Sequence, residues 1–283
     1  MQINLDGKIA VSEKEYKSQI AKLEQTIKKF MATKSRYIIP TSKKNEIKFA
    51  VIGDTHFGSV HDKTDALHAF IKQAKKENCE LVLHAGDVLA GHNVYAGQEF
   101  EVYALGLEKQ LEAAKNNMPD YLPVHFITGN HDDSFKKQTG IEVGKLIAQK
   151  LPFMHYLGDS SGCIVIKTKA GAQYKIALIH PDGGTAYALS YHPQKIVESL
   201  SGGQKPHMLI IGHYHKAEFI PQYRNVTSIL AGTFEGQTKF MMRKHSAAHI
   251  GGWIVKVIVG EQKSLCTRIQ AEFINFYEKA TME

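Results

Sequence analysis

The chain has 283 residues, of which 43% are hydrophobic and 22% charged, and its formal net charge is +7. This composition excludes a wholly disordered chain, and no apolar run reaches the roughly 20 residues that a membrane-spanning helix needs. The three cysteines form no C-x-x-C pair, and the N-terminus lacks the pattern of a secretory signal. The cysteine pattern therefore argues against a disulfide scaffold and a thiolate zinc site, and we expect a cytoplasmic protein.

The positive charge is concentrated near the N-terminus. Residues 1–50 hold eleven Lys/Arg against five Asp/Glu, whereas residues 51–283 hold twenty-four against twenty-three. Ser12 and Glu15 match the capping-box pattern of a helix start, and an apolar stripe at helical spacing follows them. Its members are Tyr16, Ile20, Leu23, Ile27 and Phe30. We predict a basic helical segment over residues 1–45, which either packs on its own domain or binds a partner or a second copy of the chain.

From residue 46 to residue 283 the sequence has the pattern of a separate domain, in which short apolar runs alternate with helical stretches. The expected strands are Ile47–Gly53, Glu80–Ala85, Pro123–Thr128, Cys163–Thr168, Tyr174–His180, Met208–Gly212, Val226–Ala231 and Trp253–Val259. The expected helices are Thr64–Lys76, Glu99–Asn116 and Ala186–Leu200. This alternation predicts an α/β domain with a parallel sheet flanked by helices.

Small polar side chains follow five of the expected strands. The clusters are Asp54-Thr55-His56, Gly86-Asp87, Gly129-Asn130-His131-Asp132, His180 and Gly212-His213-Tyr214-His215. Ligands bind at the carboxyl ends of strands in open α/β sheets, so we expect these clusters to meet at one site. Oxygen and imidazole donors without a thiolate suit Mn²⁺, Fe or Zn²⁺, and there are more of them than one ion needs. The pattern indicates two divalent ions sharing a carboxylate, which suits displacement at phosphorus.

In this order, the motifs D-x-H, G-D, G-N-H-D, H and G-H-x-H resemble those of the calcineurin-like metallophosphoesterase superfamily. The resemblance implies a sandwich of two mixed β-sheets flanked by helices, and a dinuclear centre that hydrolyses phosphoric esters. Among the metals that the donor set suits, we expect Mn²⁺, with Fe or Zn²⁺ as alternatives. The resemblance also implies the ligands, with Asp54, His56 and His215 at one ion, Asn130, His180 and His213 at the other, and Asp87 bridging both.

The same resemblance implies that His131 is the general acid for the leaving oxygen and that Asp132 orients the His131 imidazole. His92 is a candidate for supporting a metal ligand, because it follows Gly86-Asp87 on the same loop. The chain departs from the family pattern at Pro181, which stands after His180 where the family usually has glycine.

Further residues favour one branch of the superfamily. The segment 187–191 with Gln194-Lys195, and Lys205-Pro206 ahead of the last motif, resemble exonuclease-like phosphoesterases of phages and prokaryotes. Lys216 is a candidate contact to a phosphodiester backbone. Four tyrosines are candidates for stacking on bases, with ordinary surface and core positions as the alternative: Tyr95, Tyr103, Tyr187 and Tyr191.

We therefore expect a DNA or RNA nuclease whose substrate is a nucleic acid or nucleotide phosphodiester. The alternatives are a small-nucleotide phosphodiesterase or phosphomonoesterase, and a non-enzymatic scaffold subunit. The intact set of expected ligands speaks for an enzyme.

Overall fold

The computed structural model describes residues 37–40, 45–260 and 266–276, apart from residues 170, 172, 185, 202 and 204. The helix expected from the apolar stripe of residues 16–30 lies outside these residues. Residues 37–40 form strand β1, which pairs in parallel with strand β6 of the main domain. The last part of the expected N-terminal segment thus contributes an edge strand to a sheet.

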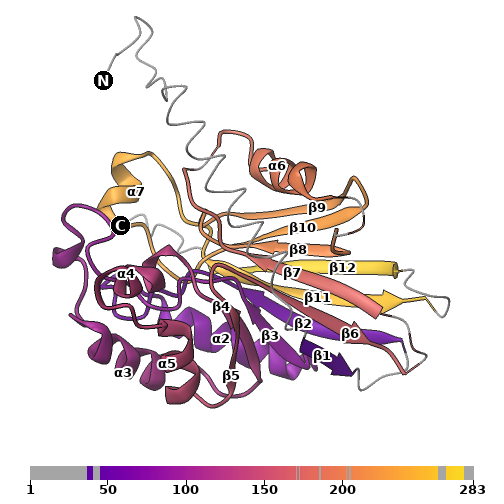
Figure 1. Ribbon diagram of the computed structural model, residues 1–283, viewed down its shortest axis with the longest axis horizontal. Helices are drawn as coiled ribbons and strands as arrows, with labels where there is room; N and C mark the ends of the chain where they lie inside the picture. The colour runs from indigo at the N-terminus through magenta and orange to yellow at the C-terminus, as the bar shows by residue number, and fades with distance from the viewer. Residues whose placement is uncertain are drawn as a thin grey trace, which may run out of the picture.

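Two six-stranded sheets lie face to face (Figure 1). The first has the order β1-β6-β7-β8-β10-β9 and the second the order β12-β11-β2-β3-β4-β5. The strands of the first are β1 (Tyr37–Pro40), β6 (Ser161–Lys167), β7 (Gln173–Ile179), β8 (Met208–Ile211), β9 (Ala217–Tyr223) and β10 (Val226–Ala231). Those of the second are β2 (Glu46–Ile52), β3 (Leu81–His84), β4 (Val124–Ile127), β5 (Met154–Gly158), β11 (Gly251–Val259) and β12 (Cys266–Asn275). Both sheets are mixed, which confirms the expected sandwich.

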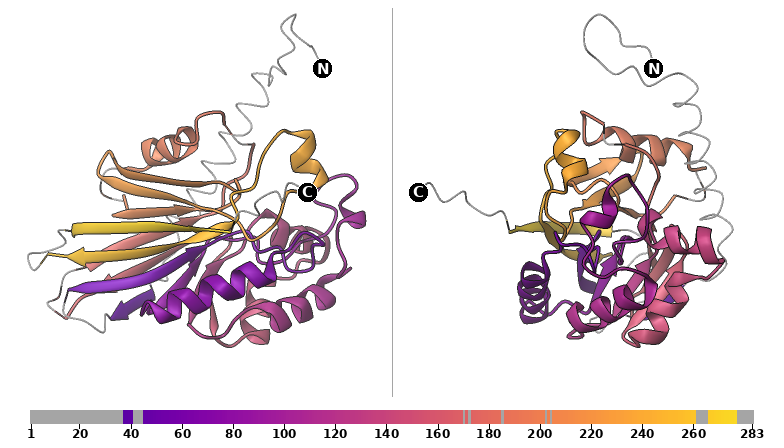
Figure 2. Two further views of the ribbon diagram at one scale, coloured as in Figure 1. Left: turned by 180° about the vertical axis from the view of Figure 1, so that it is seen from behind. Right: turned by 90° about the vertical axis from the view of Figure 1, so that its left-hand side faces the viewer.

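Helices cover the outer faces of the sandwich and also lie at one of its ends (Figure 2). On the outer face of the second sheet lie α2 (Thr64–Lys76), α3 (Leu107–Asn117) and α5 (Val143–Lys150), and on that of the first lies α6 (Tyr191–Ser199). The expected helix over residues 64–76 is confirmed. Two further helices, α4 (Asn130–Thr139) and α7 (Lys239–Arg243), lie at the same end of the sandwich (Figure 1).

The core between the sheets is built from alternate residues of the strands. Phe49, Val51, Ile176, Ile210 and Val255 are fully buried there. Trp253 of β11 joins the two sheets, because its indole N–H donates to the carbonyl of Leu230 in β10 at 2.9 Å. This hydrogen bond satisfies the one polar atom of a side chain that is otherwise apolar.

The helix expected over Glu99–Asn116 begins only at Leu107. Residues 98–100 form a short 3₁₀ turn, and Gly106, with φ of 90°, precedes the helix. Glu101 explains the break, because its carboxylate is buried against groups from two distant loops instead of facing solvent on a helix. The helix expected from residue 186 similarly begins later, at Tyr191.

Several elements were not expected from the sequence, among them β5, β9, β12, α4, α5 and α7. Strand β9 contains Pro221, and a proline lowers the expectation of a strand because it has no N–H for the ladder. The structure explains this exception, since β9 is an edge strand that pairs only with β10.

We predict that Phe49→Ala lowers the free energy of unfolding by about 3–5 kcal/mol, because it leaves a cavity between the two sheets. Urea denaturation measures this change. Phe100→Ala is the matched control, since the Phe100 side chain is 79% exposed and its loss should stay within about 0.5 kcal/mol. Equal effects of the two substitutions would contradict the assignment of the core.

Candidate metal centre

The expected ligands meet at the end of the sandwich where parallel strands from both sheets finish. Asp54 follows β2, Asp87 follows β3 and Asn130 follows β4, while His180 and His213 follow β7 and β8 of the other sheet. Because β2, β3 and β4 are parallel, and β7 and β8 are parallel, their carboxyl ends lie side by side. All seven residues predicted as ligands are thus brought into one cluster.

The backbone at this cluster is unusually strained. Five of the seven predicted ligands have φ in the left-handed region: Asp54 at 53°, His56 at 45°, Asp87 at 54°, His213 at 80° and His215 at 53°. Such conformations cost free energy in residues with a Cβ, and they concentrate at functional sites where surrounding contacts enforce them. The geometry of this cluster is therefore imposed by the fold.

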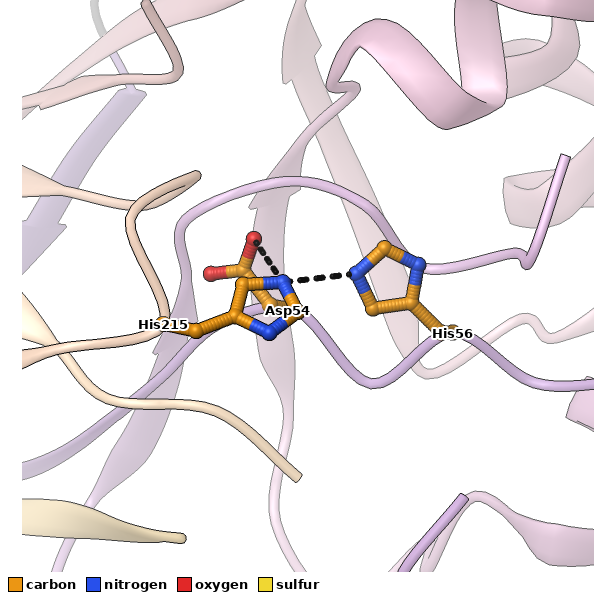
Figure 3. A group of neighbouring side chains, drawn as sticks. All are labelled: Asp54, His56 and His215. Carbon is orange, nitrogen blue, oxygen red and sulfur yellow. Dashed lines mark hydrogen bonds and ion pairs between the residues drawn. The ribbon is translucent and has the colours of Figure 1, made fainter. Parts of the chain in front are cut away.

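The first group of donors consists of Asp54, His56 and His215 (Figure 3). The Nε2 atoms of the two imidazoles lie 3.1 Å apart, and His215 Nε2 lies 3.6 Å from Asp54 Oδ1. The other carboxylate contacts of Asp54 are to the backbone N–H of His213, at 3.0 and 3.1 Å. Three donor atoms thus converge on one small volume, as a metal site requires.

The second group consists of Asp87, His180, His213 and Asn130. His180 Nε2 lies 3.1 Å from Asp87 Oδ2 and 3.1 Å from Asn130 Oδ1, and Asn130 Oδ1 also lies 2.9 Å from His213 Nδ1. The His180 Nδ1–H donates to the carbonyl of Ala85 at 2.8 Å, which directs Nε2 into the cluster. Asp87 Oδ2 lies 3.9 Å from His56 Nε2, so this carboxylate stands between the two groups.

The electrostatics of the cluster suit a divalent cation. Burial lowers the pKa of His213 to about 4 and that of His215 to about 3, so both imidazoles are neutral and can act as ligands. Burial disfavours a charged His180, but the Asp87 carboxylate raises the pKa of His180 to about 10. The Asp87 carboxylate thus favours positive charge next to it. Two buried imidazole nitrogens, Nδ1 of His56 and Nδ1 of His215, have no hydrogen-bond partner.

Tight packing explains the glycines that stand before the predicted ligands. A Cβ on Gly129 would lie 2.2 Å from Asp87 Oδ1, and one on Gly86 would lie 2.5 Å from His180 Nδ1. Gly86 also has φ of +96°. These two glycines let the loops approach closely enough for the donors to converge.

His131, the predicted general acid, lies beside the first group. Its ring centroid is 4.4 Å from that of His56, in an edge-on arrangement, and its backbone N–H donates to Asp87 Oδ1 at 2.8 Å. Its Nδ1–H donates to the carbonyl of Ala90 at 2.6 Å, which leaves Nε2 for another group.

Asp132 does not orient the His131 imidazole as expected. The fully buried Asp132 carboxylate instead accepts three backbone N–H groups, from Val88, Leu89 and Gly129, at 2.8–3.1 Å. Asp132 is the third residue of α4, where a carboxylate naturally caps the helix start, and Ala90 takes over the orientation of the ring. Asp132 therefore fixes the Asp87 loop against α4.

One acidic residue near the cluster is not predicted by the sequence motifs. Glu235 is buried, and its Oε2 lies 3.7 Å from His56 Nε2 and 3.9 Å from His215 Nδ1. Burial raises the pKa of Glu235 to about 8. Its position in the chain could have predicted it, because Glu235 follows shortly after β10. This strand is parallel to β8, so the two strands finish at the same end of the sheet.

Further predicted residues lie outside the two donor groups. The ring of His92 is stacked on Phe135 and its Nε2 is within 3.1 Å of the Asn93 amide, on the loop after Asp87. The Lys216 ammonium donates to the carbonyl of Ala247. Tyr187 is fully exposed on the loop between His180 and α6, and Tyr191 is the first residue of α6.

The model of the calcineurin-like phosphoesterase superfamily domain matches residues 47–245. This range includes every predicted ligand and covers well over half of the chain. The chain therefore belongs to the calcineurin-like phosphoesterase superfamily, which confirms the resemblance seen in its motifs.

Curated relatives in sequence are archaeal DNA polymerase II small subunits. The protein of Methanothermobacter thermautotrophicus is 24% identical over 248 residues, which cover 71% of this chain and 51% of that protein. The protein of Halobacterium salinarum is 30% identical over 99 residues, which cover 33% of this chain and 20% of that protein. The chain thus spans about half the length, or less, of the curated relatives it matches.

Similar solved structures include a phosphatase from Mycoplasma pneumoniae, at 14% identity and a TM-score of 0.44, covering 82% of this chain and 95% of that one. A serine/threonine phosphatase from Saccharomyces cerevisiae is 11% identical, with a TM-score of 0.41 and coverage of 94% and 91%. Wild-type Vps29 from Entamoeba histolytica, complexed with Zn²⁺, is 14% identical, with a TM-score of 0.39 and coverage of 82% and 100%.

Among the helices that the structure describes, none combines the length and the apolar character needed to cross a membrane.

We predict that Mn²⁺ raises the melting temperature of the wild-type protein, because a ligand that binds only the native state stabilises it by about 2.7 kcal/mol at a hundredfold excess over its Kd. Asp87→Asn should lose most of this increase, since the carboxylate between the two groups loses its charge. Thermal denaturation with and without Mn²⁺ measures the shift. Asp65→Asn, on the exposed face of α2, should retain it, and an undiminished shift in Asp87→Asn would refute the bridging role.

We predict that Glu235→Gln weakens Mn²⁺ binding by about 10–100-fold, the usual effect of removing a group that supports metal ligands. Isothermal titration calorimetry measures the affinity. The fold should survive, because burial already favours the neutral form of this side chain. Glu218→Gln, on edge strand β9, is the control, and equal affinities of the two variants would exclude a role for Glu235.

Proposed function

We propose that the protein is a metal-dependent phosphodiesterase with two divalent ions, and that its substrate is a nucleic acid. The observation that carries this proposal is the pair of donor groups that share the Asp87 carboxylate, with the His131 imidazole beside them. Family membership supports phosphoester hydrolysis as the reaction class. The mixed nitrogen and oxygen donor set supports Mn²⁺, with Fe or Zn²⁺ as alternatives.

The two donor groups support the expected roles of the ligands. Asp54, His56 and His215 would hold one ion and Asn130, His180 and His213 the other, with Asp87 common to both. When bound, such ions activate water and neutralise the phosphoryl oxygens.

The contacts of His131 support its proposed role as general acid. Its Nδ1–H is held by the Ala90 carbonyl, so a second proton on this ring resides on Nε2. From there the proton can pass to the leaving oxygen of a phosphodiester. The backbone N–H of His131 donates to Asp87, which ties the position of the imidazole to that of the bridging carboxylate.

Two observations support nucleic acid as the substrate. The curated relatives are named as subunits of a DNA polymerase, which connects related sequences with DNA. The segment that carries α7 beside the site contains Lys239, Arg243 and Lys244 and no acidic residue, so it provides positive charge for a phosphodiester backbone. The exonuclease-like character expected from residues 187–206 belongs to the same proposal.

The word "subunit" in those names also supports a protein partner. The basic segment of residues 1–45 would contact this partner, or a second copy of the chain, through the apolar stripe predicted from its sequence. A purely non-catalytic subunit would be expected to have lost donor residues, whereas all seven expected ligands are retained here.

We predict that His131→Ala lowers kcat for bis(p-nitrophenyl) phosphate by about 10²–10⁴-fold in the presence of Mn²⁺, the range that general acid catalysis usually contributes. Calorimetry should show Mn²⁺ affinity close to that of the wild type, because His131 is not among the proposed ligands. His68→Ala is the matched control, since His68 lies on α2 and contacts the backbone carbonyl of Asn117. Full activity of His131→Ala would exclude the proposed acid.

The choice of substrate is tested with the same wild-type preparation. Turnover of single-stranded and duplex oligonucleotides is compared with that of cyclic mononucleotides and nucleoside monophosphates. A preference for mononucleotides would replace the nuclease by a small-nucleotide phosphodiesterase or phosphomonoesterase. Activity on none of these substrates, together with no Mn²⁺ binding, would point to a scaffold subunit.

A further inference from the structure

A line of aromatic rings leads from the candidate metal centre to the protein surface. The Tyr95 ring lies 6.4 Å from the His131 ring, and Phe240 of α7 stacks on Tyr95 with ring centroids 5.2 Å apart and planes inclined by 28°. Phe240 is 45% exposed. The Tyr95 ring thus connects the partly exposed Phe240 ring with the ring of His131, the proposed general acid.

Positively charged residues flank Phe240 along the chain. Helix α7 runs from Lys239 to Arg243, and Lys244 is its C-cap residue. The Lys244 ammonium lies 6.0 Å from the centre of the Phe240 ring. From residue 237 to residue 250 the chain contains no Asp or Glu. The surface therefore offers both an aromatic face and cations that can pair with phosphates.

A buried carboxylate holds this surface in place. Glu101 accepts from the Tyr95 hydroxyl at 3.0 Å, from the Lys239 backbone N–H at 2.9 Å and from His61 Nε2 at 2.9 Å. Its side chain is almost inaccessible to solvent. Tyr95, the start of α7 and the His61 loop are thus fixed to one another by one acid.

The other end of the same segment is tied to a predicted metal ligand. The Lys216 ammonium donates to the Ala247 carbonyl, and the His249 N–H donates to the His215 carbonyl at 2.9 Å. The position of α7 is therefore fixed relative to the metal centre from both sides. A rigid surface loses little entropy when a ligand binds.

Resting on the proposed function, we propose that Phe240, Tyr95 and the cations of α7 and its C-cap residue form a binding surface for single-stranded nucleic acid. This surface would place a strand end at the candidate metal centre. An unpaired base exposes the π-face that Phe240 can stack on, whereas the bases of a duplex are already stacked. Lys239, Arg243 and Lys244 would contact the backbone phosphates. A hydrophobic protein partner is the competing occupant, and the charge around the ring argues against it.

The test is direct binding of a fluorescein-labelled oligothymidylate of about ten nucleotides, within the usual site size for single strands. Fluorescence anisotropy is measured with the full chain in EDTA, so that no cleavage occurs. Phe240→Ala should raise the Kd about tenfold, the loss expected for one stacked base, and Phe240→Tyr should restore affinity to within about twofold. A blunt duplex should bind more weakly than the single strand.

Met242→Ala is the matched control, because Met242 lies on the same helix and is 49% exposed. It should leave the Kd for oligothymidylate within about twofold of the wild type, since a thioether offers no ring for stacking. Equal affinities of the wild type and Phe240→Ala, or equal losses in Phe240→Ala and Met242→Ala, would overturn the proposal. Tighter binding of the duplex would overturn it as well.

A failure of the proposed binding surface can be distinguished from a failure of the proposed hydrolysis. Oligonucleotide binding that depends on Phe240, without cleavage in Mn²⁺, would support this surface and refute the nuclease. Hydrolysis of bis(p-nitrophenyl) phosphate with no affinity for the oligonucleotide would refute this surface and leave phosphodiester hydrolysis supported.

Discussion

The position of one carboxylate, that of Asp87, determines the arrangement of the candidate site. It lies 3.1 Å from His180 Nε2, accepts the backbone N–H of His131, and stands 3.9 Å from His56 Nε2. Parallel strands from two different sheets must finish around it for these contacts to form. Three features make this possible: the close approach of Gly129, the capping of α4 by Asp132 and the left-handed φ of the predicted ligands.

The residues that gather at the carboxyl ends of the strands could be predicted from the sequence, because the motifs that identify them are local. Most of the predicted ligands come within a few residues of a strand end. The residues that follow parallel strands lie together at the carboxyl ends of those strands. Glu235 and Glu101 carry no such local signal. Their importance depends on tertiary neighbours, namely His56 and His215 for the first, and His61, Tyr95 and α7 for the second.

The fold was predicted in class and in most of its strands, and the failures have physical reasons. The sequence predicts the start of the helix over residues 99–116 several residues before its actual start at Leu107. Glu101 fits an ordinary helix position in the sequence, and only the fold reveals its buried partners. Strand β9 was missed because Pro221 is tolerated only at an edge, which the sequence does not reveal. The role of Asp132 was assigned from the motif, but backbone N–H groups at a helix start compete for the same carboxylate.

Trp253 gives the molecule an intrinsic optical probe. It is the single tryptophan of the chain, it is buried, and its indole N–H bonds to the opposite sheet at Leu230. Indole emission shifts to longer wavelength in water, so unlabelled protein signals the moment at which the two sheets separate. Because the predicted metal ligands follow strands of both sheets, this one fluorophore also reports on the contact between the sheets that holds the candidate metal centre together.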